Sequence, residues 1–123
     1  MSWFTWIALV VALQVVHQVH ARAVFAHFMV TNSENYTLTD WEKDMKLAQS
    51  AHIDTFALNM AYLDKANDAS VAMAFTAANT VGFKLLFSFD YAGNGAWDQA
   101  AVIKMIQQYG SNGAYFLCLI NLI

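Results

Sequence analysis

The stretch Phe83-Lys-Leu-Leu-Phe-Ser-Phe-Asp90 decides the fold of this chain. It is a short apolar run that ends in a carboxylate, with Gly82 before it and the glycine-containing loop of residues 91–97 after it. A run of this length, aromatic and bounded by glycine, predicts a buried strand. Nearly continuous apolarity is typical of strands in parallel sheets, which are covered on both faces.

Two earlier stretches repeat this pattern. Residues 24–30 read Val-Phe-Ala-His-Phe-Met-Val, and residues 53–59 read Ile-Asp-Thr-Phe-Ala-Leu-Asn. The three runs begin at residues 24, 53 and 83, which is the spacing of strand–helix–strand units. The sequence therefore predicts an α/β protein with a parallel sheet covered by helices.

The first intervening helix is expected to end near Ala51. Thr39 and Glu42 have the spacing of a capping box, which predicts the N-terminal end of this helix. A helical repeat places four residues on one face: Trp41, Met45, Ala48 and His52. His52 also stands just before the second strand, as a residue at the helix end, and Asp54 at the start of that strand is interpreted as structural.

Two further helices follow the second and third strands. One is expected to begin at Asp68 or Ser70 and to run through Val81, where Gly82 can end it in the left-handed conformation. The other begins after Asp98 and runs to about Tyr109, where a second glycine follows. Doubly wound sheets and (β/α)₈ barrels share this order of elements. The absence of a Gly-x-Gly-x-x-Gly turn after the first strand disfavours a dinucleotide-binding sheet.

The N-terminal residues predict export. Residues 3–16 are apolar but shorter than the roughly 20 residues of a membrane span. Val19-His20-Ala21 fits the small-x-small rule for signal peptidase. We therefore expect a signal peptide over residues 1–21, a secreted product and no stable membrane insertion after cleavage; an uncleaved anchor is the alternative. Asn35-Tyr36-Thr37 is a glycosylation acceptor, used or unused, that agrees with secretion.

Composition excludes several classes of function. The chain has 123 residues and a net charge of −3 without a basic stripe, which argues against a nucleic-acid partner. Cys118 is the single cysteine, so no internal disulfide or cysteine zinc site is expected. No histidine pairing has metal-ligand spacing, and we expect no metal.

Candidate site residues come from the rule that parallel α/β proteins bind ligands at the carboxyl ends of their strands. Asp90 follows an apolar strand directly, where a carboxylate suits acid–base chemistry; the alternative is that it bonds the backbone of its own loop. Asp64, in the loop after the second strand, is either a second such carboxylate or a solvated one. The remaining candidates are polar and aromatic residues that could bind substrate or complete the core: His27, Asn59, Tyr36, Tyr91 and Trp97.

Taken as a whole, residues 23–116 resemble glycoside hydrolase family 71, the fungal α-1,3-glucanases or mutanases. The similarity lies in ordered blocks that include Ala51-His52-Ile53-Asp54-Thr55-Phe56-Ala57-Leu58-Asn59 and Phe87-Ser88-Phe89-Asp90-Tyr91-Ala92-Gly93. Further blocks lie at residues 23–30, 35–37, 40–42, 46–49, 74–79, 82–85 and 111–116. The resemblance implies a (β/α)₈ barrel, endo-hydrolysis of α-1,3-glucan with inversion, and no cofactor.

The resemblance also sets the expected domain organisation. Residues 22–116 would be the first three to four units of the barrel, and residues 117–123 an aberrant apolar tail where the family continues into further strands. The main catalytic acids are expected on those later strands. Asp90 and Asp64 are therefore carried over as sugar-contacting or assisting carboxylates, although residues 61–64 depart from the glycine and paired acids that the family tends to have there.

Three functions remain as expectations. The first is a truncated N-terminal part of an α-1,3-glucanase that lacks activity by itself, which release of reducing sugar by the 123-residue chain would contradict. The second is a secreted carbohydrate-binding or wall-associated module without catalysis, which pull-down on α-glucan by a monodisperse chain would favour. The third is a membrane-anchored structural protein, which N-terminal sequencing of the secreted product separates from the other two.

Overall fold

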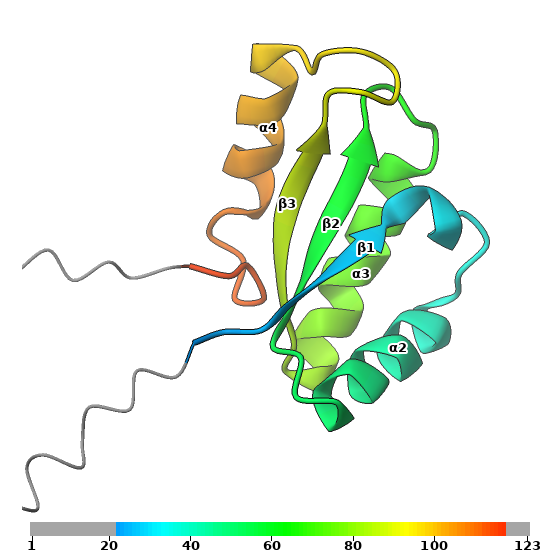
Figure 1. Cartoon of the computed structure of the whole chain (residues 1–123), viewed down its shortest axis with the longest axis vertical. Coiled ribbons are helices and arrows are strands. Elements are labelled where there is room, and N and C mark those ends of the chain that lie inside the picture. Colours follow the sequence, from blue (N-terminus) through cyan, green and yellow to red (C-terminus); the bar gives the residue numbers. More distant parts are fainter. Residues whose placement is uncertain (1–21, 118–123) are drawn as a thin grey trace, which may run out of the picture.

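The computed structural model describes residues 22–117. The expected signal peptide, residues 1–21, and residues 118–123 of the apolar tail lie outside this range. The elements in chain order are β1 (Phe25–Met29), the 3₁₀ helix η1 (Val30–Ser33), α2 (Leu38–Ser50), β2 (Thr55–Ala61), α3 (Asn67–Val81), β3 (Lys84–Asp90) and α4 (Gln99–Tyr109). The strands form a parallel sheet in the order β1-β2-β3, as the spacing predicts (Figure 1).

One face of the sheet carries the core. The strand register sets Phe28 beside Leu58 and Leu58 beside Phe87, and these side chains face the helices. Trp41 of α2 packs 4.7 Å from the Phe28 ring, and Tyr109 of α4 lies 5.8 Å from the Phe87 ring. Phe75 of α3 contacts both Phe87 and Tyr109. All three α-helices therefore cover the same face, which leaves the opposite face free of helices within residues 22–117.

A further segment pairs with the outer edge of β3. The Leu85 N–H donates to the Ala114 carbonyl at 2.9 Å, and the Phe116 N–H donates to the Leu85 carbonyl at 2.8 Å. This is a parallel bridge between Leu85 and Tyr115. Residues 114–116 therefore run parallel to β3 along its outer edge.

The helix-free face curves inward. Tyr115 packs against Phe87 on the helix side, so the next residue, Phe116, points to the opposite face because side chains alternate along an extended segment. There its ring meets that of Phe25 on β1 at 5.1 Å, edge to face. Phe25 lies on β1 at one edge of the sheet, and Phe116 lies beyond β3 at the other edge. Their rings can meet across β2 and β3 only if this face of the sheet is concave.

The start of α2 differs from the prediction. Thr37, not Thr39, is the N-cap: its hydroxyl accepts from the Asp40 N–H at 3.3 Å, and the Asp40 carboxylate accepts from the Thr37 N–H at 2.9 Å. The predicted box of Thr39 and Glu42 is wrong because a second threonine with an acid three residues later precedes it. Glu42 instead lies 3.7 Å from Lys46, one turn further along the helix.

The buried face of α2 is confirmed in part. Trp41, Met45 and Ala48 are buried. His52 is wrong as a member of this face, because it lies beyond the helix end with a left-handed φ of 59° and is exposed. Its interpretation as a residue at the helix end is confirmed. Asp54 is structural as predicted, since its carboxylate accepts from the Val24 N–H at 2.7 Å and joins the starts of β1 and β2.

The other helix ends follow the sequence more closely. Gly82 ends α3 with a φ of 72°, and Asp98 caps α4 by accepting from the Ala101 N–H at 3.1 Å. The predicted caps of α3 are wrong: Asp68 lies within its first turn, and Ser70 is buried and donates to the Ser33 carbonyl at 3.3 Å.

Candidate functional site

Three of the predicted site residues share the helix-free face. In the register, Met29, Asn59 and Ser88 form one row, Ala61 and Asp90 the row above it, and His27, Ala57 and Leu86 the row below. The Asn59 amide donates to the Ser88 hydroxyl at 3.4 Å. His27, Asn59 and Asp90 are thus brought to one surface, with Asn59 and Asp90 toward its carboxyl-terminal edge. Sequence reasoning missed Ser88, although it alternates with Asp90 along the same strand.

Asp90 joins the sheet to its loop. One carboxylate oxygen accepts from the Ala92 N–H at 2.8 Å, which is the loop-binding role that the sequence left open. The side chain is half-buried at the end of β3. The carboxylate therefore has a fixed orientation while part of it stays accessible to a ligand on the helix-free face.

Gly93 brings the backbone of this loop against the Asp90 carboxylate. A Cβ at position 93 would lie 2.8 Å from the Ala61 Cβ and 3.2 Å from an Asp90 oxygen. The Ala61 methyl group is fixed to the strand backbone, so the loop would have to move. The close approach of strand end and loop therefore depends on glycine at this position.

Substitution Gly93→Ala is expected to destabilise the protein by about 1–3 kcal/mol, the range typical of overpacking, and to displace Asp90. Urea denaturation measures the first effect. Gly113→Ala is the control, because its Cβ would meet only the Asn79 side-chain oxygen at 3.6 Å, an ordinary contact. Equal stability of the two variants would contradict the packing described for this loop.

The loop after β3 is also tied to the end of β2. Asn94 donates to the Tyr62 carbonyl at 2.9 Å, and the Trp97 indole N–H donates to the Met60 carbonyl at 3.0 Å. Trp97 is 8% exposed and packs against Tyr62 and Phe89. Its ring closes the core, which is the second of the two roles that the sequence left open, and its contact with substrate stays a prediction.

Asp64 is held by the loop after β1. Its carboxylate accepts from the Thr31 hydroxyl at 2.7 Å and from the Ala66 N–H at 2.9 Å. The Thr31 bond, and after it the Ala66 bond, lowers the pKa of Asp64 below its ordinary value. A carboxylate that stays ionised in this way suits a hydrogen-bond acceptor or a base, not a general acid.

Removing the Thr31 hydroxyl is expected to raise the pKa of Asp64. The native pKa lies below the unfolded value of about 3.9, so this contact stabilises the fold above that pH and its contribution is lost as the pH falls through the native pKa. Thr31→Val should move acid unfolding to higher pH and shift the Asp64 carboxyl carbon titration upward by NMR. Thr76→Val is the control, since that hydroxyl bonds only the Ala72 carbonyl of its own helix. An unchanged Asp64 titration in Thr31→Val would contradict the contact.

Tyr36 does not lie with Asp90. Its hydroxyl donates to Asp44 at 2.9 Å, and this bond raises the pKa of Tyr36. Its ring packs on Phe28 and Trp41, which belong to the helix side. Tyr36 therefore lies apart from the Asp90 surface, and its role in substrate binding stays a prediction.

The two remaining predicted residues lie in exposed loops. Tyr91 is 58% exposed directly after Asp90, so its ring is available to a ligand. Asn35 is exposed in the turn before α2, beside a hollow of about 360 Å³ that Tyr36 also lines. The structure leaves both of their predicted roles open.

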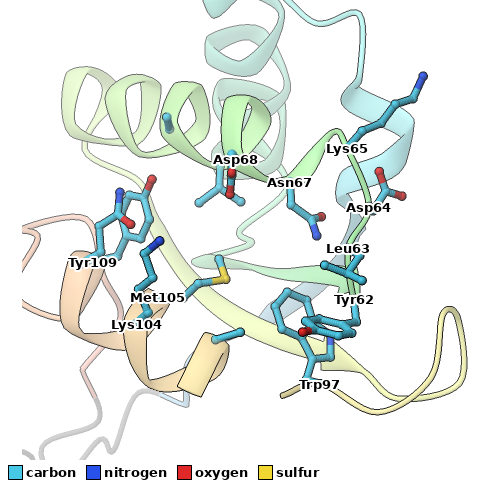
Figure 2. A pocket seen from close by; sticks show the side chains of 14 residues that line it. Tyr62, Leu63, Asp64, Lys65, Asn67, Asp68, Trp97, Lys104, Met105 and Tyr109 are labelled. Atoms are coloured by element: carbon cyan, nitrogen blue, oxygen red, sulfur yellow. The ribbon is translucent and has the colours of Figure 1, made fainter. Parts of the chain in front are cut away.

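A cavity with a volume of about 650 Å³ lies between α3 and α4, on the helix side of the sheet (Figure 2). Asp64 and Trp97 line it, whereas Asp90, Asn59 and His27 do not. His27, Asn59 and Asp90 therefore lie on the helix-free face, whereas Asp64 and Trp97 lie at this cavity.

Residues 22–117 contain no cluster of three or more histidine, cysteine, aspartate or glutamate residues that could hold a metal ion. In the same range, no helix is long and apolar enough to cross a membrane.

Comparison with known proteins identifies the family. The chain is 43% identical over 91 residues to a mutanase of Penicillium rubens, covering 74% of this chain and 20% of that protein. It is 40% identical over 73 residues to a glucan endo-1,3-alpha-glucosidase of Schizosaccharomyces pombe, covering 56% of this chain and 16% of that protein. The chain thus spans about a fifth or less of the length of these relatives. The family model for glycosyl hydrolase family 71 matches residues 20–121, and the chain belongs to this family.

Proposed function

We propose that residues 22–116 form the first units of a (β/α)₈ barrel in a secreted enzyme that hydrolyses α-1,3-glucan with inversion. Support for the substrate comes from the two relatives, whose names are mutanase and glucan endo-1,3-alpha-glucosidase. The helix-free concave face, which gathers polar side chains at its carboxyl-terminal edge, is the observation that carries the proposal.

The barrel is favoured by the position of α4. In a doubly wound sheet the strand order reverses at a switch point, and helices then cover the second face as well. Here α4 packs on the same face as α2 and α3, and residues 114–116 pair beyond β3 and not beside β1. If further strands are added beyond β3 in the same direction, with right-handed crossovers, the sheet curls around its helix-free face. The contact between the Phe25 and Phe116 rings already bends the sheet in this sense.

In a closed barrel the helix-free face becomes the interior, and its carboxyl-terminal edge becomes the mouth where substrates bind. Asp90 would contact or assist at the sugar, Asn59 and Ser88 would bind hydroxyl groups, and Tyr91 would stack on a pyranose ring. The acid and base of inversion, roughly 6.5–9.5 Å apart in such enzymes, would come mainly from later strands.

A chimera tests this proposal. Residues 22–116 replace the matching segment of the Penicillium rubens mutanase, and release of reducing sugar from α-1,3-glucan is measured. We expect hydrolysis, with the β-anomer as the first product by NMR because inversion of an α-linkage yields it.

Three outcomes would contradict the proposal. A soluble, folded chimera without hydrolysis would favour the non-catalytic binding module, provided that it still binds glucan. The α-anomer as first product would exclude inversion. An uncleaved N-terminus in the culture supernatant, found by N-terminal sequencing of the full chain, would contradict removal of a signal peptide.

A further inference from the structure

The cavity between α3 and α4 has an aromatic end and a polar wall. Tyr62 lies at the aromatic end against Trp97, with ring centroids 5.3 Å apart. Lys104 and Gln108 of α4 and Asp68 of α3 lie along its sides. Its volume of about 650 Å³ falls within the range of about 300–1,000 Å³ of small-molecule sites.

Asn67 is a buried polar group in this wall. It is 6% exposed, and its amide nitrogen donates to the Ala61 carbonyl at 2.8 Å. Its carbonyl oxygen Oδ1 has no hydrogen-bond partner among residues 22–117. Figure 2 shows the Asn67 side chain projecting from the start of α3 toward Leu63 and Tyr62, across the cavity from the α4 side chains. This oxygen has almost no exposed surface, so a ligand hydroxyl reaches it only when the Asn67 side chain turns toward the cavity. The new hydrogen bond would then remove the free-energy cost of a buried acceptor without a partner.

The charges around the cavity select the kind of ligand. Lys65 pairs with Glu34 at 2.7 Å, which leaves Asp64 and Asp68 against Lys104, so net charge does not favour an anion. Tyr109 contributes a neutral hydroxyl, because burial and, secondarily, the nearby Asp68 charge raise its pKa. A mixture of donors and acceptors beside an aromatic ring fits a neutral ligand with many hydroxyl groups, each of which can donate and accept.

We propose that this cavity is a second carbohydrate site, separate from the Asp90 face, that holds a glucosyl unit with one hydroxyl donating to Asn67 and the sugar resting beside Tyr62. The choice of an α-1,3-linked glucosyl unit, and not another polyol, rests on the proposed function. Because the site lies on the helix side, it would anchor glucan without taking part in hydrolysis.

Substitution Ala72→Phe tests the site by filling it. Ala72 lines the cavity and is exposed on α3, so a phenyl ring there occupies ligand space without entering the core. In calorimetric titration of the full chain with an α-1,3-linked glucose tetramer, affinity should fall at least about tenfold. Ala69→Phe is the matched control, on the same helix and exposed but outside the cavity lining, and it should bind as the unchanged chain does. Lys104→Met, which removes a donor from an exposed side chain, should also weaken binding.

Several results would overturn the inference. The first is that the tetramer does not bind to a chain that circular dichroism shows to be folded. The second is that Ala72→Phe and Lys104→Met leave the affinity for the tetramer unchanged. The third is that glycerol or inorganic phosphate binds as tightly as the tetramer or more tightly. The tests of the two sites are separable. Asp90→Asn in the chimera should lower kcat/KM for hydrolysis by about 100-fold or more but leave this binding intact. A separate outcome is a chimera that folds but fails to hydrolyse glucan, while the tetramer binds the chain and Ala72→Phe weakens this binding. In that case the proposed function fails and the second site stands.

Discussion

Asp90→Asn in the chimera is expected to lower kcat/KM for α-1,3-glucan by about 100-fold or more, the lower end of the range for a positioned acid–base group. The amide keeps the oxygen that accepts from the Ala92 N–H, so the loop should hold its place while the negative charge is lost. The measurement is release of reducing sugar over a range of glucan concentrations, together with the circular dichroism spectrum to confirm folding.

The control for this substitution is Asp98→Asn. Asp98 is an exposed aspartate in the same connection, but its carboxylate caps α4 by accepting from the Ala101 N–H. Asparagine is an equally good cap, so activity should be unchanged. If both variants retain full activity, Asp90 does not act on the substrate, and its position on the helix-free face serves only its loop.

Trp41→Ala is expected to destabilise the chimera by about 3–5 kcal/mol, the usual cost of truncating a buried tryptophan. Trp41 is fully buried, with the Phe28 ring at 4.7 Å and the Tyr36 ring at 5.6 Å. It anchors α2 on the helix side of the sheet, and the cavity left by alanine lies in the centre of this contact. Urea denaturation followed by circular dichroism gives the change in the free energy of unfolding.

Trp41→Phe is the matched variant. The Trp41 indole N–H is buried and has no hydrogen-bond partner among residues 22–117, so phenylalanine removes a polar group whose burial is uncompensated. We expect its cost to be clearly smaller than that of alanine. A loss below about 1 kcal/mol for Trp41→Ala, the centre of the distribution for all substitutions, would contradict the central position of this residue.

The sequence predicted the strands and helices because periodic apolarity and glycine positions act locally. The strand of residues 83–90, the left-handed Gly82 and the Asp98 cap follow from neighbouring residues alone. The N-cap of α2 was displaced because Thr37 and Thr39 each precede an acid by three residues. Nothing in the local pattern decides between two overlapping boxes.

The site was harder to predict because it depends on which face each side chain reaches. The rule for the carboxyl ends of parallel strands selected Asn59 and Asp90, and the register places them on one face with His27. Loop aromatics have no such register, and Tyr36 and Trp97 turned to the helix side, where Phe28, Phe89 and Tyr62 supply apolar contacts. The cavity at Asn67 arises only from the packing of α3 and α4 across β3, which no sequence pattern specifies.

The central claim is that the helix-free face becomes the lined interior of a closed barrel with Asp90 at its mouth. A crystal structure of the chimera with an α-1,3-linked glucose tetramer tests this most directly. We expect strands to continue beyond residues 114–116 around that face, and a sugar hydroxyl within hydrogen-bond distance of the Asp90 carboxylate. A helix packed across His27 and Asn59, with the sugar remote from Asp90, would contradict it.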